Sequence, residues 1–174
     1  MKATLGFLLA AIALSGCAGM SPSTSGAVAN LKPTEGNAAN GTVRFVQKGD
    51  VVTMEARVDG LTPGLHGFHV HEKGDCSAPD AMSAGGHFNP SHKGHGDPAH
   101  GEHHVGDLGN LNANASGHAA LELSVPSAQF TLDKNAPNSV VGRALVVHAD
   151  PDDLKTQPAG NSGKRVACGV IATQ

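Results

Sequence analysis

The segment Gly67-Phe68-His69-Val70-His71 alternates histidine with apolar residues. On a β-strand, successive side chains point to opposite faces. His69 and His71 are therefore expected on one face of a sheet, while Phe68 and Val70 enter a core. Neutral imidazole is the commonest protein ligand for zinc and copper, so two imidazoles on a rigid strand suit two ligands of one metal ion.

Further candidate ligands follow in the same region of the chain. They occur in Gly86-His87-Phe88-Asn89-Pro90, at His95 and in His104-Val105-Gly106-Asp107. Any one histidine is usually an ordinary surface or hydrogen-bonded residue. Imidazoles and a carboxylate gathered this densely indicate a metal centre instead.

Short segments of alternating apolar and polar residues recur along the chain, and no stretch sustains a period of 3.6 residues. We expect strands at residues 27–31, 41–47, 51–59, 65–71, 105–111, 118–125, 140–148 and 166–173. Eight short strands separated by glycine and proline predict an all-β sandwich or barrel. Two connections, 72–104 and 149–165, are long, and such loops in a compact domain are usually functional.

Composition narrows the fold and the partners. Aromatic residues make up only 3% of the 174 residues, with neither Trp nor Tyr, so the core is expected to consist mostly of Val, Leu, Ile and Ala. The formal net charge is −3 and no basic stripe is present. Nucleic acid is therefore not an expected partner.

The first 16 residues read as a secretory signal. Lys2 precedes an apolar run at residues 5–14, which is too short to cross a bilayer. The run ends in Leu14-Ser15-Gly16-Cys17, which resembles a bacterial lipobox, in which the cysteine is lipidated. The alternative is an ordinary cleavable signal ending near Ala18-Gly19-Met20, with Cys17 incidental.

The lipobox interpretation divides the chain into three parts. Residues 1–16 are a lipoprotein signal peptide, 17–26 a lipidated flexible tether and 27–174 the folded domain. Ala18, and not Asp, follows Cys17, and by resemblance to the bacterial sorting rule this favours an anchor in the outer membrane. The expected location is therefore periplasmic, at a membrane.

Two other cysteines remain, Cys76 and Cys168. Export would place them in an oxidising compartment, where a disulfide can persist. Reduced buried thiols or thiolate metal ligands are the alternatives, although no C-x-x-C pattern supports ligands.

Five separated segments carry a resemblance to a known family. They are G-F-H-V-H-E at 67–72, A-G-G-H-F-N-P at 84–90, H-V-G-D-L-G-N at 104–110, G-R-A-L-V-V-H at 142–148 and R-V-A-C-G-V-I at 165–171. In this order they resemble copper/zinc superoxide dismutase in its exported bacterial form. The resemblance extends from about residue 27 to the end of the chain.

The resemblance implies an eight-stranded Greek-key β-barrel or flattened sandwich, with one copper and one zinc ion between the two long loops. The implied copper ligands are His69, His71, His87 and His148, and the implied zinc ligands are His87, His95, His104 and Asp107. His87 would belong to both ions as a bridging imidazolate.

The resemblance also implies roles for four further residues. Asp152 would be the carboxylate that hydrogen-bonds His69 and His95, with Asp150 and Asp153 as close rivals. Arg165 would attract and orient the substrate anion, and Cys76 and Cys168 would form the family disulfide.

The implied reaction is dismutation of superoxide to dioxygen and hydrogen peroxide by a Cu(II)/Cu(I) cycle. Zinc, which has no accessible redox change, would be the structural and electrostatic partner. A metal-sequestering lipoprotein on the same fold is the main alternative. A zinc peptidase lacks support because H-E-x-x-H is absent. The choice between monomer and homodimer stays open.

Five histidines fall outside the implied ligand set: His66, His92, His100, His103 and His118. Those in the loop 72–104 could capture scarce metal. We expect ordinary exposed loop residues instead, because a loop fixes no ligand geometry.

Overall fold

The protein, as a computed structural model, is described over residues 24–174. The expected signal peptide, the proposed lipidation at Cys17 and most of the tether lie outside the described residues. The described chain forms β1 (Thr24–Pro33), β2 (Asn40–Lys48), β3 (Val51–Asp59), β4 (Gly64–His71), β5 (Asp107–Ala113), β6 (Ala119–Pro126), β7 (Ala144–His148) and β8 (Arg165–Thr173), with a short 3₁₀ turn η1 (Met82–Ala84). Within this part, no helix is long and apolar enough to cross a membrane.

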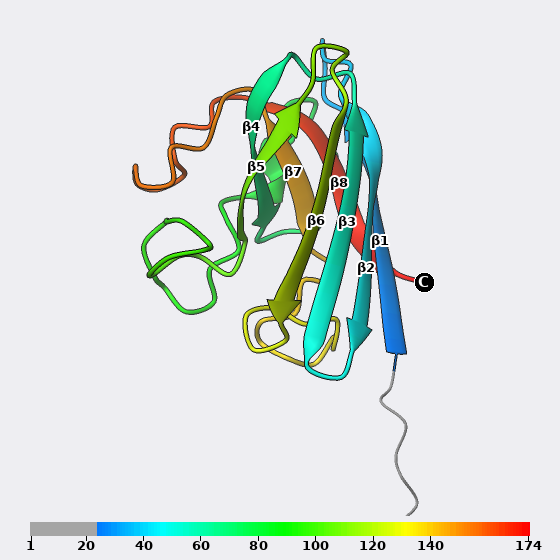
Figure 1. Ribbon diagram of the computed structural model, residues 1–174, viewed down its shortest axis with the longest axis vertical. Helices are drawn as coiled ribbons and strands as arrows, with labels where there is room; N and C mark the ends of the chain where they lie inside the picture. The colour runs from blue at the N-terminus through cyan, green and yellow to red at the C-terminus, as the bar shows by residue number, and fades with distance from the viewer. Residues whose placement is uncertain (1–23) are drawn as a thin grey trace, which may run out of the picture.

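The strands form one sheet in the order β5-β4-β7-β8-β1-β2-β3-β6, and all its ladders are antiparallel. The sheet curls until β5 approaches β6, so the barrel is nearly closed (Figure 1). β4 follows β3 in the chain but pairs on the far side of the sheet, which is a Greek-key connection. The predicted all-β fold with eight strands is confirmed.

The core follows from the alternation of side chains along the strands. Phe68 and Val70 of β4 are fully buried in the main apolar cluster, as predicted. Phenylalanine contributes more than composition suggested, since Phe45 and Phe130 also meet edge to face in this cluster, with ring centroids 6.5 Å apart.

The strand β7 is buried on both faces. Leu145 and Val147 face the barrel core, while Ala144 and Val146 join a second small cluster. That cluster contains residues around η1 and the disulfide between Cys76 and Cys168, which confirms the predicted pairing. The loop after β4 is thereby fixed against β7 and β8.

Three strands differ from the sequence-based expectation by more than one residue at a boundary. β1 begins at Thr24, so three residues expected in the tether pair with β2. The predicted strand at 140–148 is wrong over its first four residues, because Gly142 adopts a left-handed φ of 79° and makes a turn there. The strand expected at 105–111 instead runs from Asp107 to Ala113.

Candidate metal centre

Four histidines from three segments converge beside the barrel. His69 and His71 lie on β4, His148 ends β7, and His87 lies in the loop after η1. One ring nitrogen of each lies within 4.8 Å of the others. All four residues are almost completely buried, the most exposed being His87 at 9%.

Hydrogen bonds decide which nitrogen of each ring is free. Nε2–H of His69 donates to Asp152 Oδ2 at 2.7 Å, and Nδ1–H of His71 donates to the Gly85 carbonyl at 2.9 Å. Nδ1–H of His148 faces the Gly163 carbonyl at 3.3 Å. The opposite nitrogens are thus left as acceptors, which is how outer partners set the tautomer of a metal ligand.

Two of these buried nitrogens, Nδ1 of His69 and Nε2 of His87, have no hydrogen-bond partner among the described residues. A buried polar atom without a partner is costly in a protein interior. The Nε2 atoms of His71 and His148 lie 3.4 Å apart, close enough to share one ion. Four imidazole nitrogens in this arrangement fit a copper ion, because imidazole is a suitable ligand for copper.

A second group lies around the carboxylate of Asp107, at the start of β5. Its Oδ1 atom lies 2.8 Å from His87 Nδ1, 3.0 Å from His95 Nδ1 and 3.3 Å from His104 Nδ1. His95 Nδ1 lies close to this oxygen yet outside hydrogen-bond geometry. Ligands about 2.0 Å from a tetrahedral zinc ion are about 3.3 Å apart, so this donor set fits zinc.

His87 belongs to both groups through its two ring nitrogens. Nδ1 faces Asp107, and Nε2 is left for the first group. The ring stacks on that of His69, with centroids 3.9 Å apart. A single imidazole therefore lies between the two candidate sites.

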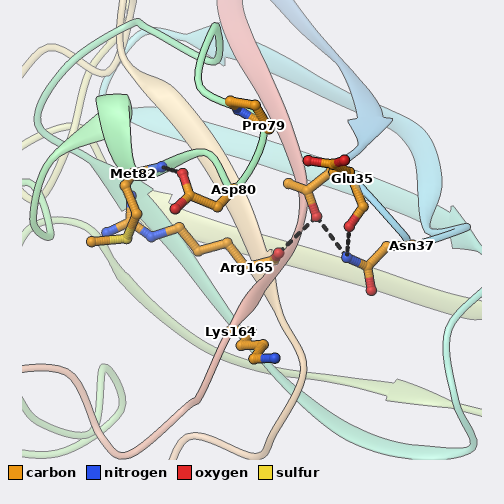
Figure 2. A pocket seen from close by; sticks show the side chains of 8 residues that line it. Glu35, Asn37, Pro79, Asp80, Met82, Lys164 and Arg165 are labelled. Atoms are coloured by element: carbon orange, nitrogen blue, oxygen red, sulfur yellow. Dashed lines mark hydrogen bonds between the residues drawn. The ribbon is translucent and has the colours of Figure 1, made fainter.

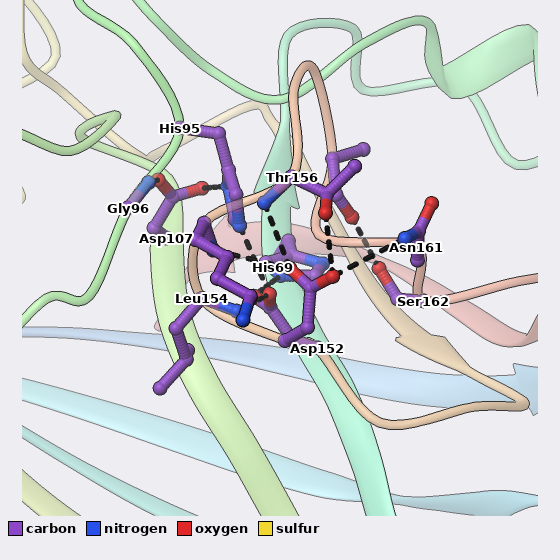
Figure 3. A network of polar contacts seen from close by, with 12 residues as sticks. His69, His95, Gly96, Asp107, Asp152, Leu154, Thr156, Asn161 and Ser162 are labelled. Atoms are coloured by element: carbon purple, nitrogen blue, oxygen red, sulfur yellow. Dashed lines mark hydrogen bonds and ion pairs between the residues drawn. The ribbon is translucent and has the colours of Figure 1, made fainter.

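The carboxylate of Asp152 joins the two groups from the other side. Oδ2 accepts from His69, and Oδ1 accepts from His95 Nε2 at 2.9 Å (Figure 3). Asp150 is exposed, and Asp153 accepts hydrogen bonds from Thr156 within its own loop. Of the three carboxylates considered from the sequence, Asp152 is the one that links two candidate ligands.

The charge states of these groups suit metal binding. Burial lowers the pKa of His87 to about 4 and that of His148 to about 3, and it also lowers the pKa of His71. These rings are neutral at pH 7 and can donate a lone pair. Burial alone would lower the pKa of His95, but the nearby carboxylates of Asp107 and Asp152 outweigh this and raise it to about 9.

Arg165 begins β8 and reaches toward the first group. Its guanidinium donates to the carbonyl oxygens of Ala81 and Gly85, both at 2.6 Å. Its charge contributes to the lowered pKa values of His71 and His148, and its guanidinium shares the Gly85 carbonyl with Nδ1–H of His71. The same side chain lines a pocket with Lys164 and Met82 (Figure 2).

Irregular pairing occurs next to two of the histidines. The β4–β5 register shifts between Gly67 and His69, and the β7–β8 register shifts between Val147 and His148. Such bulges turn side chains away from strict alternation.

The remaining histidines lie outside both candidate ligand groups. His92 and His100 are exposed, and His103 is partly buried against the Gly101 carbonyl. His118 pairs with Asp59 at the surface, at 2.8 Å. His66 is buried, with Nδ1 2.8 Å from the carbonyl of His148, so it supports the end of β7.

Sequence reasoning missed several residues that shape the site. Asn110 of β5 accepts from the Asp152 N–H at 2.8 Å and donates to its carbonyl at 2.9 Å. Gly160 has a φ of 65°, and a Cβ there would overlap the Asp152 carboxylate and lie 2.7 Å from His95 Nε2. Asn110 is the last residue of the H-V-G-D-L-G-N segment, so its place in that motif could have identified it from the sequence. Gly160 lies outside all the quoted segments, and no sequence pattern pointed to it.

An eight-stranded Greek-key barrel with two fused metal-ligand groups beside it defines a class of dinuclear metalloprotein. Comparison with known proteins makes the class specific. Residues 39–171 match the family model described as copper/zinc superoxide dismutase. This match spans most of the chain, and the chain belongs to the copper/zinc superoxide dismutase family.

Two similar proteins carry names in keeping with the family. One is "Extracellular superoxide dismutase [Cu-Zn]" of Brugia pahangi, 47% identical over 158 residues, which are 86% of this chain and 76% of that protein. The other is "Superoxide dismutase [Cu-Zn]" of Onchocerca volvulus, 45% identical over 148 residues, 79% of this chain and 90% of that protein. The chain is therefore an oxidoreductase that dismutates superoxide with copper and zinc as cofactors, as predicted. Both of these relatives are from nematodes, and the bacterial subtype remains a proposal.

Proposed function

We propose that His69, His71, His87 and His148 hold the copper ion of this superoxide dismutase, and that His87, His95, His104 and Asp107 hold the zinc ion. The observation that carries the proposal is the shared His87, whose two ring nitrogens face two different groups of donors. When bound, copper supplies the one-electron redox chemistry and zinc supplies fixed positive charge without a redox change. The remaining steps belong to the protein's own side chains.

His87 is the proposed proton carrier, at Nε2. That atom is buried, without a hydrogen-bond partner among the described residues, and directed at the copper group. Nδ1 on the opposite side of the ring faces Asp107, and zinc held by both residues would keep the ring in place while Nε2 gains or loses a proton. Release of hydrogen peroxide consumes two protons, and a ring at this position can deliver one of them.

Arg165 is the proposed group that draws superoxide in and orients it. A guanidinium stays cationic near neutrality, and carries five N–H donors in a planar fork. The two hydrogen bonds to Ala81 and Gly85 fix the plane of the fork and leave other donors for the anion. The fixed charge beside His71 and His148 raises the local concentration of a small anion.

The test is metal content and superoxide dismutation measured on one purified sample of residues 18–174. One copper and one zinc per chain are expected, with activity lost on copper removal and regained on its return. The variant His87→Ala should bind both metals in independent steps and lose most activity. Full zinc without tight copper, or both metals without turnover, would count against the ligand assignment.

We further infer that the chain is exported and anchored by lipid at Cys17, in the manner of the exported bacterial form that its sequence resembles. The support is Leu14-Ser15-Gly16-Cys17 behind a short apolar run. The word "extracellular" in the name of the Brugia pahangi protein is in keeping with secretion. Periplasmic location and attachment to the outer membrane follow from this inference.

Membrane fractionation tests the anchor. Wild type expressed with its signal should sediment with outer membranes and incorporate labelled palmitate, whereas Cys17→Ala should appear as soluble periplasmic protein. Ala18→Ser, which keeps the cysteine, serves as the control. Continued membrane association of Cys17→Ala would argue against lipidation.

A further inference from the structure

Gln157 makes an unusual pair of hydrogen bonds to a single residue, the candidate zinc ligand His95. Its Oε1 accepts from the His95 N–H at 2.8 Å, and its Nε2–H donates to the His95 carbonyl at 2.8 Å. The two residues are 62 positions apart, in different long loops. One carboxamide thus satisfies both backbone groups of His95, as a neighbouring strand would in a ladder.

These contacts matter because His95 lies outside the strands that support other ligands. His69 and His71 are fixed by β4, and Asp107 by β5, whereas His95 belongs to an irregular loop. A pair of hydrogen bonds at N–H and C=O fixes the position of the residue and its rotation about the chain. The direction of the Cα–Cβ bond, from which the imidazole extends, follows from both.

The loop that carries Gln157 also contacts the ring of His95. Asp152, five positions earlier, accepts from His95 Nε2 at 2.9 Å. The backbone and the ring of His95 are therefore connected to one loop, residues 149–164, by three hydrogen bonds. Gly160 lies against the same contact with no room for a side chain.

We propose that Gln157 is a positioning residue for the zinc ligand His95 and that it couples retention of zinc to closure of the loop 149–164. The proposal rests on the zinc ligands assigned above. The Gln157 pair holds the backbone of His95 in place, so loss of the pair lets His95 shift away from the other zinc ligands and makes release of zinc easier. Outer partners of metal ligands typically change metal affinity by about 10–100-fold.

The test is the rate of zinc release from zinc-loaded, copper-free protein to a chromogenic chelator in excess. Gln157→Leu, of similar size without polar atoms, should release zinc about 10–100-fold faster than wild type. Gln157→Glu keeps the acceptor for the His95 N–H but loses the donor, and should fall between the two. Lys155→Ala, in the same loop, has an exposed side chain outside these hydrogen bonds and should match wild type.

Two further readouts separate positioning from a general loss of stability. The visible spectrum of cobalt bound in place of zinc should change in Gln157→Leu, because the His95 ring turns. The melting temperature should drop more for the zinc-loaded variant than for the metal-free variant. Equal release rates in wild type, Gln157→Leu and Gln157→Glu, with an unchanged cobalt spectrum, would overturn the proposal.

The variant His95→Ala keeps this result separate from the ligand assignment. If His95→Ala still binds zinc as wild type does, the assignment of His95 fails. If His95→Ala loses tight zinc while both Gln157 variants behave as wild type, the assignment stands and only the role of Gln157 is refuted.

Discussion

His71 and Arg165 donate hydrogen bonds to the same atom, the carbonyl oxygen of Gly85, at 2.9 and 2.6 Å. The proposed copper ligand and the proposed substrate-orienting cation are thereby positioned by one peptide group. Gly85 has a φ of 76°, and a Cβ there would lie 2.8 Å from Cγ of Glu72, so the position requires glycine. The distance between the arginine and the copper group is fixed by backbone, not by flexible side chains.

This arrangement predicts the effect of removing the cation. Arg165→Ala should lower the dismutation rate constant by about 10-fold or more at low salt, because the focused positive field is lost. Bound copper and zinc should be unchanged, since Arg165 belongs to neither ligand group. Stopped-flow decay of superoxide, with metals measured on the same sample, checks both statements.

Arg44→Ala is the control, because Arg44 is an exposed arginine on β2. It changes the net charge equally but should leave the rate within about twofold, since β2 carries none of the candidate metal ligands. Equal rates for wild type and Arg165→Ala would remove Arg165 from the mechanism.

The link that Asp152 makes between the two proposed metal sites predicts a shared loss of affinity. In Asp152→Asn the side chain offers one acceptor and one donor, whereas His69 and His95 both present N–H groups. At least one ring must lose its partner, and zinc and copper affinity should each fall by about 10–100-fold. Competition with chelators measures both constants.

Asp150→Asn is the matched control for this prediction. Asp150 is exposed, and its substitution removes the same charge as Asp152→Asn, two residues away in the chain. Its metal affinities should stay close to those of wild type. A loss as large as that in Asp152→Asn would mean that loop charge, and not the bridging carboxylate, governs affinity.

The raised pKa of His95 predicts proton release on zinc binding. With a pKa of about 9, His95 carries a proton at pH 7 in the metal-free protein, and zinc bound at the proposed site must displace it. Zinc affinity should therefore rise as pH increases toward about 9 and fall on acidification. His87, with a pKa of about 4, is already neutral and releases no such proton near neutrality.

The raised pKa of His95 also determines how the stability of the metal-free fold changes with pH. Because the folded pKa lies above the usual 6.5, protonated His95 stabilises the fold fully below pH 6.5, and this contribution is lost as pH rises through about 9.

The release of a proton on zinc binding can be measured by calorimetry. Titration of zinc at pH 7 in two buffers of different ionisation enthalpy should show roughly one proton released. Identical heats in both buffers would contradict the prediction.

The disulfide predicts a large change in the stability of the metal-free protein. Cys76 and Cys168 are 92 residues apart, and opening a loop of this size costs about 4–5 kcal/mol in the chain-entropy model. Denaturant unfolding of the metal-free double variant Cys76→Ser/Cys168→Ser should show a loss of that order. A loss below about 1 kcal/mol would indicate that the packing of Ala81 and Ala84 against β7 holds the loop by itself.

Some of the site was readable from local chemistry alone. His69 and His71 share a face because a strand has a period of two, and the structure places Phe68 and Val70 in the core accordingly. No such period relates His87, His95 and His104, which lie in a loop. Their grouping in the sequence analysis came from resemblance, not from geometry.

Other features were beyond sequence reasoning. The carboxamides of Asn110 and Gln157 bind backbone groups far away in the chain, and such contacts leave no periodic pattern. The apolar run at 140–148 was misjudged because its glycine takes a left-handed conformation that apolar content does not reveal. Local pattern predicts strands, whereas contacts between loops depend on the finished fold.

The two register shifts beside His69 and His148 carry a lesson for protein design. A barrel rebuilt with uniform hydrogen-bond ladders would keep the strand order and the apolar interior. It would also return both imidazoles to the ordinary pleat and spread the nitrogens that now converge. Transfer of this metal centre to an idealised scaffold therefore requires the two register shifts as well as the histidines.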